Sequence, residues 1–173
     1  LIPNHISYYA MHTNFDVRGM AALAAERMGL TDCAVLDVTC EGEDGCEGIG
    51  RVGMLPEEMT LKACIERVKQ VYDVDMVKVF GDLNQKVRRA AICPGSGKSV
   101  ISCALGAGAG VLVTGDIDHH EGIDAADQGL AIIDAGHYGV EKLFIPYMAQ
   151  YLRNRTEGIE IVEQPVKQPF HYL

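Results

Sequence analysis

The stretch Asp134-Ala-Gly-His137-Tyr-Gly-Val-Glu141 decides the fold of this 173-residue chain. It continues the apolar run at 131–133, which is typical of a buried strand, and Gly136 marks a break after that run. Apolar residues then recur at helical spacing, at Val140, Leu143, Phe144, Met148 and Tyr151. The stretch therefore predicts a strand that turns at a glycine into a helix over 137–151.

His137 and Glu141 are the reactive side chains of this stretch. They stand four residues apart, so a helix places them on one face, one turn apart. An imidazole and a carboxylate that converge where a strand meets a helix suit a divalent metal ion or acid–base chemistry. The same short pattern also occurs in helices where both side chains only cap the helix or meet solvent. The rest of the chain has to decide between these two interpretations.

Strands and helices alternate along the chain. The predicted strands are 6–11, 33–39, 49–55, 75–81, 87–93, 110–114, 131–133 and 159–162. The predicted helices are 18–30, 61–71, 98–105, 121–130 and 137–151, with Thr60 as the cap of the second. Short crossovers between apolar strands from residue 87 onward favour parallel pairing. We therefore predict an α/β fold with a mixed, largely parallel sheet and helices on its faces, as a single region 1–173 with possible sub-lobes 1–85 and 86–173.

Polar clusters follow four of the predicted strands. They lie at 12–16, 94–99, 116–121 and 134–141. In such sheets ligands bind outside the carboxyl ends of the strands, so this common placement predicts one convergent site. His12 and Asp16 repeat the residue types and the spacing of His137 and Glu141, and together the two pairs could supply ligands to one or two metal ions.

Other catalytic motifs are weaker. Gly95-Ser-Gly-Lys-Ser99 resembles a phosphate loop, but a true loop needs a glycine where Ile92 stands, so a helix cap or a modest anion site is favoured. The run 116–121 is either a helix capped by Asp118 or a source of one or two site residues. The chain has no GxSxG elbow for a serine nucleophile.

The composition limits the classes of function. Hydrophobic residues make up 48% of the chain, so a real core can form, and no apolar run is long enough to span a bilayer. The net charge of −9 argues against a nucleic-acid or anionic-membrane binder and suits a cation site. The six cysteines form no CxxC pair, which indicates reduced thiols in a cytoplasmic protein. Cys40 and Cys46 flank an acidic loop, where a disulfide or a metal clip is the alternative.

Four pieces of the chain, in this order, resemble the Nif-three-like dinuclear-metal family, the GTP cyclohydrolase I type 2 homologues. They are Tyr9-Ala-Met-His12-Thr-Asn-Phe-Asp16, Cys93-Pro-Gly-Ser-Gly, Thr114-Gly-Asp116-Ile-Asp-His-His120 and Asp134-Ala-Gly-His137-Tyr-Gly-Val-Glu141. Pro169-Phe170 near the end also fits. The resemblance covers nearly the whole chain, and the combination of pieces is specific although each piece alone is not.

The resemblance implies two divalent metal ions, such as Zn, Fe or Mn, in a cleft of an α/β protein that often assembles as a hexameric ring. Carried over residue by residue, it implies that Asp16 ligates one metal, that His137 ligates the other and that Glu141 bridges both. His12 and His120 match positions near the cleft, where they could move protons or support the ligands.

The resemblance departs from the family at the start of the chain. The family carries a His-His pair upstream of the motif that contains His12, and each His of that pair ligates one metal. The printed sequence begins at Leu1, so the resemblance predicts that roughly the first third of a family member has been cut away from it, that its ligand set is incomplete and that apolar surface is exposed.

The leading hypothesis is a metal-dependent hydrolase that activates water and acts on a small molecule such as a nucleotide. One alternative is a non-catalytic metal-binding or regulatory protein that acts through partners. Another is an α/β domain that binds a small molecule without metal.

Overall fold

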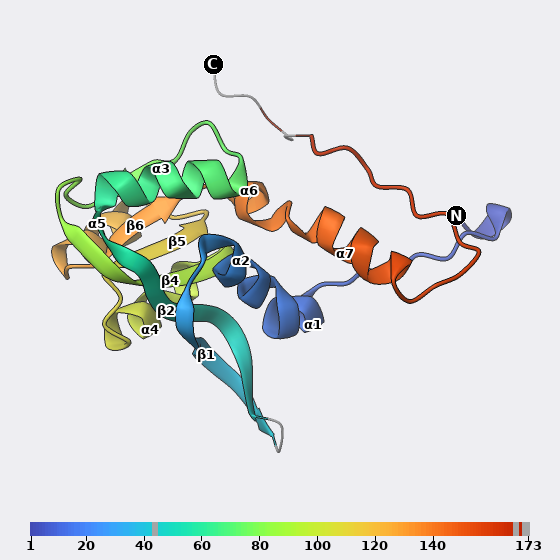
Figure 1. The fold of residues 1–173 in the computed structure, drawn as a ribbon, viewed down its shortest axis with the longest axis horizontal. Coiled ribbons are helices and arrows are strands. Elements are labelled where there is room, and N and C mark those ends of the chain that lie inside the picture. The colour runs from blue at the N-terminus through green and yellow to red at the C-terminus, as the bar shows by residue number, and fades with distance from the viewer. Residues whose placement is uncertain (43–44, 168–169, 171–173) are drawn as a thin grey trace.

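The computed structural model describes residues 1–42, 45–167 and 170, and a single six-stranded sheet organises them (Figure 1). The strand order is β1-β2-β4-β5-β6-β3. The strands are β1 (Thr31–Gly42), β2 (Gly45–Thr60), β3 (Lys78–Phe80), β4 (Lys86–Ser96), β5 (Val111–Gly115) and β6 (Ala131–Asp134). The α-helices are α1 (Thr13–Phe15), α2 (Ala21–Met28), α3 (Leu61–Tyr72), α4 (Ile101–Gly106), α5 (His119–Asp127), α6 (His137–Glu141) and α7 (Phe144–Arg153).

The predicted α/β fold with a mixed sheet is confirmed, and its parallel part lies at the centre. β5 pairs in parallel with β4 and with β6, whereas the pairs β1–β2, β2–β4 and β3–β6 are antiparallel. The sheet is therefore less parallel than predicted, because β1 and β2 form a hairpin and hairpin strands are antiparallel by construction. Strands from 1–85 and from 86–173 share this one sheet.

Helices cover both faces of the sheet and bury a hydrophobic cluster under each. One cluster packs α2 and α3 on the sheet through residues such as Met28, Leu61 and Tyr72. The other packs α4 and α5 on the opposite face through Ala104 and Ala125. Thr60 caps α3 as predicted, since its hydroxyl accepts a hydrogen bond from the Ala63 amide at 3.2 Å. These two layers fix the carboxyl ends of the parallel strands, where the site lies.

Three predicted elements differ in the structure. The segments 6–11 and 159–162 form no strand, because neither finds a partner for its backbone hydrogen bonds. Ile6, Tyr8 and Tyr9 are exposed there, so exposed apolar surface is present as expected. The helix predicted over 137–151 is split into α6 and α7. Pro169 lies outside the described residues.

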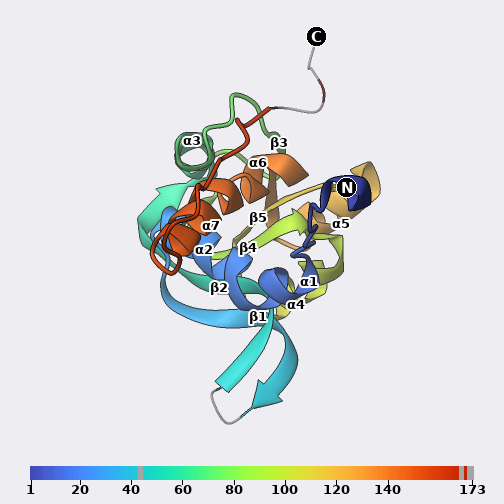
Figure 2. The same ribbon diagram turned by 90° about the vertical axis from the view of Figure 1, so that its right-hand side faces the viewer.

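The β1–β2 hairpin projects from the body of the molecule (Figure 2). Near its tip Cys40 pairs with Glu47, and Glu41 pairs with Cys46. Neighbouring pairs of an antiparallel ladder point to opposite faces, so the two thiols lie on opposite sides of the ribbon. Both thiols are free, so the disulfide considered from the sequence is not formed, and the opposite directions of the two side chains disfavour the metal clip. No helix within the described ranges has the length and apolar character needed to cross a membrane.

Candidate metal centre

The turn between β6 and α6 places His137 at the edge of the sheet. Gly136 adopts φ 77°, a conformation that glycine takes without strain, and α6 begins at the next residue. The end of β5 lies directly beside this turn, because a Cβ on Gly115 would stand only 2.6 Å from the carbonyl carbon of Gly136. The sequence break predicted at Gly136 is therefore the point where two strand ends and a helix start meet.

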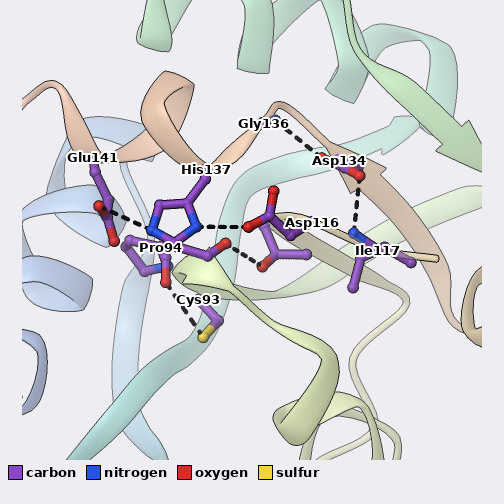
Figure 3. A network of polar contacts seen from close by, with 10 residues as sticks. Cys93, Pro94, Asp116, Ile117, Asp134, Gly136, His137 and Glu141 are labelled. Carbon is purple, nitrogen blue, oxygen red and sulfur yellow. Dashed lines mark hydrogen bonds and ion pairs between the residues drawn. The ribbon is translucent and has the colours of Figure 1, made fainter. Parts of the chain in front are cut away.

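Asp134 is the buried carboxylate that holds this junction together (Figure 3). Its Oδ2 accepts a hydrogen bond from the Ile117 amide at 3.0 Å, and its Oδ1 accepts one from the Gly136 amide at 3.0 Å. Lys78 lies 3.0 Å from Oδ2 and also donates to the Ile117 carbonyl at 2.5 Å. Asp134 thus ties the loop after β5 to the turn after β6. This role was not predicted from the sequence, although an Asp two residues before a glycine is a known turn signal.

His137 lies between two carboxylates (Figure 3). Its Nδ1 is 2.7 Å from Oδ2 of Asp116, and its Nε2 is 3.3 Å from Oε2 of Glu141. In the neutral ring, a hydrogen bond from Nδ1 to Asp116 leaves the lone pair of Nε2 facing Glu141 and the pocket. This is the arrangement by which a carboxylate orients a metal-ligating histidine. Asp116 was proposed from the sequence only as one of several possible site residues.

His12, Asp16, His137 and Glu141, which we call the donor cluster, line a common pocket with Gly95 and Cys93. The structure therefore brings together the two His–carboxylate pairs that the sequence placed at separate strand ends. Gly95 has φ 75°, and a Cβ there would stand 2.7 Å from Oε1 of Glu141. The pocket floor therefore requires glycine at this position, a constraint that the sequence analysis did not identify.

Asp16 reaches the donor cluster from an unusual helical turn. Residues Asp16–Met20 form a π-helical segment, a conformation often found at functional sites. The preceding Phe15 packs edge-to-face on Phe144 of α7, with ring centroids 5.1 Å apart. This aromatic contact fixes the first helical turn against α7 and so sets the position of Asp16.

The carboxylates of the site crowd one another. Burial raises the pKa of Glu141, and the charges of Asp16 and Asp116 add to that rise despite the opposing effect of His137 and His12. Burial alone would lower the pKa of His137, but the hydrogen bond to Asp116 and the charges of Glu141, Asp116 and Asp16 raise it. The site therefore attracts positive charge, either as a proton on His137 or as a cation.

The donor chemistry fits a divalent metal ion. Imidazole nitrogen together with carboxylate oxygen suits Zn, Fe or Mn, and a cation would relieve the repulsion between Asp16 and Glu141. Across residues 1–42, 45–167 and 170, no three His, Cys, Asp or Glu side chains already stand in a complete metal-binding arrangement. The donor cluster thus provides ligands of the right kind in one pocket, without a finished coordination shell.

The polar cluster 116–121 contributes Asp116 alone to the surroundings of His137. His120 is absent from the lining of the donor-cluster pocket and instead lies at the start of α5, its ring 5.3 Å from that of His119. Asp118 occupies the N-cap position of α5 but makes no capping hydrogen bond with its side chain. Lys98, the lysine of the loop that resembles a phosphate loop, forms an ion pair with Glu121. Its charge is therefore already matched by a carboxylate.

We expect the pKa of His137 in the metal-free protein to lie above about 6.5 and to fall when Asp116 is changed to Asn, because the substitution removes a carboxylate charge. A raised folded-state pKa means that His137 stabilises the fold below about pH 6.5, and that this contribution is lost as the pH rises through the folded-state pKa. NMR titration of the His137 ring measures this pKa. Asp118→Asn, on the same loop without contact to His137, is the control, and an equal shift in both variants would contradict the pairing.

Comparison with known proteins identifies the family. The model of the Duf34/NIF3 (NGG1p interacting factor 3) family matches residues 1–169. A "GTP cyclohydrolase 1 type 2 homolog" of Streptococcus pneumoniae is 34% identical over 100% of this chain and 67% of its own length. One of Lactococcus lactis is 38% identical over 96% of this chain and 63% of its own length. The chain thus spans about two-thirds of the length of these relatives.

The fold agrees with this result. The crystal structure of a Bacillus cereus protein related to NIF3 superposes with a TM-score of 0.87 and 25% sequence identity, covering 99% of this chain and 75% of that one. A Staphylococcus aureus protein of known structure gives a TM-score of 0.84 at 26% identity, covering 99% of this chain and 70% of that one. The sequence match and the shared fold together show that the chain belongs to the Duf34/NIF3 family.

Proposed function

We propose that this chain carries the main part of a dinuclear site in a divalent-metal-dependent hydrolase, similar to the relatives named GTP cyclohydrolase 1 type 2 homolog. The observation that supports this most is the donor cluster, in which residues from the two ends of the chain line one pocket. A purely structural role would not require two carboxylates to crowd two imidazoles over a glycine floor. The cluster has the charge and the ligand types that a pair of divalent cations needs.

In this proposal Asp16 would ligate one metal ion, His137 would ligate the other, and Glu141 would serve as a ligand to both. Bound divalent ions supply Lewis-acid activation of water and of the electrophile. Asp116 keeps Nε2 of His137 directed to the pocket by holding Nδ1 at 2.7 Å. His12 lines the same pocket and is exposed to solvent, so it can exchange a proton with a substrate there. His120 lies outside that pocket and is the weaker candidate for proton transfer.

We propose a small molecule, in the class of nucleotides, as the substrate, and a hexamer of the whole protein as the working assembly. The names of the relatives support the first point, and the family resemblance supports the second. A non-catalytic metal-binding protein that acts through partners is the alternative. The alternative predicts metal binding without turnover, whereas the hydrolase needs an open ligand position beside His12.

The test is the metal content per chain, measured by elemental analysis on this chain and on the whole gene product. We expect two metal ions per chain in the whole protein after incubation with Zn, Mn or Fe, and loss of hydrolysis of GTP after treatment with a chelator. Metal without turnover across a panel of nucleotides would favour the non-catalytic alternative. Absence of metal from both proteins would refute the dinuclear site.

A further inference from the structure

A second pocket lies against the donor cluster and has a different chemical character. Its apolar wall is formed by Met11, Phe15, Met20, Phe144 and Ile145. All four donor residues line both this pocket and the pocket at Gly95, so the donor cluster stands between the two. A substrate bound at the metals would therefore have the apolar pocket directly beside its reacting bond.

We propose that the apolar pocket holds an uncharged, planar ring of the substrate, as the subsite that selects the substrate class; the proposal rests on the metal-dependent hydrolysis proposed above. The wall is preformed. The ring centroids of Phe15 and Phe144 lie 5.1 Å apart with the ring planes at 72°, and the centroids of Phe15 and Tyr147 lie 5.7 Å apart. A Cβ on Gly19 would clash with the Phe15 ring, so the glycine lets that ring lie flat on its own helix.

The groups that form the wall favour a planar substrate ring. The edges and faces of two phenyl rings offer offset or edge-to-face contacts to a flat ring. The thioethers of Met11 and Met20 are polarisable and adapt to the outline of such a ring. A branched or spherical apolar group would use the same area but would gain none of the aromatic contacts.

The preference for an uncharged ring follows from the surroundings of Lys142, which is the one lysine among the residues that line the pocket. Its Nζ donates to the Asp73 carbonyl at 2.5 Å and lies 3.4 Å from the Asp73 carboxylate. The side chain is only 11% exposed, so its stem lines the pocket while its charge is matched outside it. The apolar wall therefore offers no unmatched lysine charge to a substrate group. An anionic group would lose its hydration against this wall without gaining a partner, whereas a neutral ring is accepted.

Guanosine is a suitable probe, because it carries a flat neutral ring and no phosphate, and ribose is the control without the ring. Guanosine added to the full chain labelled at Met and Ile methyl groups should shift the signals of Met11, Met20 and Ile145 but not that of Ile123, which is exposed on α5. Phe144→Leu keeps an apolar side chain and should weaken guanosine binding about tenfold. Tyr151→Leu, elsewhere on α7, is the matched control and should leave it unchanged.

Metal content measured on the same samples separates this subsite from the proposed hydrolase. Guanosine shifts in a chain whose whole gene product binds no metal would support the subsite and refute the hydrolase. A metal-loaded whole protein without methyl shifts would overturn the subsite alone. Equal shifts with ribose would also overturn it, as would shifts that depend on protein concentration rather than on guanosine, since a second copy of the chain would then occupy the pocket. The wild-type titration decides these outcomes even if Phe144→Leu fails to fold.

Discussion

Replacing Glu141 with Gln should weaken metal binding at least about 100-fold, because the amide carries no charge and its NH2 group cannot act as a ligand. The same change should leave the metal-free chain as stable as the parent or more stable. Burial and the charge of Asp16 raise the pKa of Glu141, so folding makes the ionised carboxylate less favourable than it is in the unfolded chain. Metal titration followed by calorimetry, together with thermal unfolding in a chelator, measures both effects.

Glu66→Gln is the matched control, because Glu66 is an exposed carboxylate on α3 far from the donor cluster in the sequence. It should change neither metal affinity nor stability. A Glu141→Gln variant of the whole protein that still holds two metal ions per chain would show that Glu141 is not the bridge. A clear loss of stability in the metal-free variant would show that Glu141 has a structural role instead.

Replacing Asp134 with Ala should lower the free energy of unfolding by about 3 kcal/mol, because it leaves the buried Ile117 amide and the half-buried Gly136 amide without their acceptor and removes the ion pair of Lys78. For a chain of this size that corresponds to a fall of roughly 6–12 °C in the melting temperature. The substitution should also disturb the contact between His137 and Asp116, since Asp134 holds both the Gly136 turn before His137 and the loop that carries Asp116. Thermal unfolding and NMR titration of His137 measure the two effects.

Asp134→Asn should also lower the free energy of unfolding, because an NH2 group then replaces one carboxylate oxygen and faces an N–H donor of the protein. Lys78→Met should cost less, since Asp134 then keeps both amide hydrogen bonds. Asp124→Ala, at an exposed position of α5, is the control and should have little effect. If Asp134→Ala unfolds at the same temperature as Asp124→Ala, Asp134 does not hold the junction.

Much of the site could be predicted from local patterns. The spacing of His137 and Glu141, the break at Gly136 and the cap at Thr60 depend on residues close in sequence, and the structure has them as predicted. The repeated His–carboxylate pair at His12 and Asp16 also predicted that distant segments meet, and both residues line the pocket with α6.

Other features depend on backbone geometry that no local pattern states. Asp116 adopts φ 56°, an uncommon conformation for a residue other than glycine, and its carboxylate lies against His137 rather than with its neighbours in sequence. Lys98 pairs with Glu121, with the helix α4 and the strand β5 between them in the chain, instead of facing an anion. Asp134 could be seen as a turn residue, but its three partners come from separate parts of the chain.

The sequence by itself determined the α/β class, the parallel centre of the sheet, the strand–glycine–helix junction and the types of donor gathered at strand ends, because each follows from hydrophobic periodicity and turn chemistry within about 15 residues. Only the tertiary structure decided the antiparallel edges, the position of His120 outside the pocket, the orientation of His137 by Asp116 and the apolar wall beside the donors. These depend on which distant backbones pair and which side chains share a space, and that outcome is settled by the packing of the whole domain.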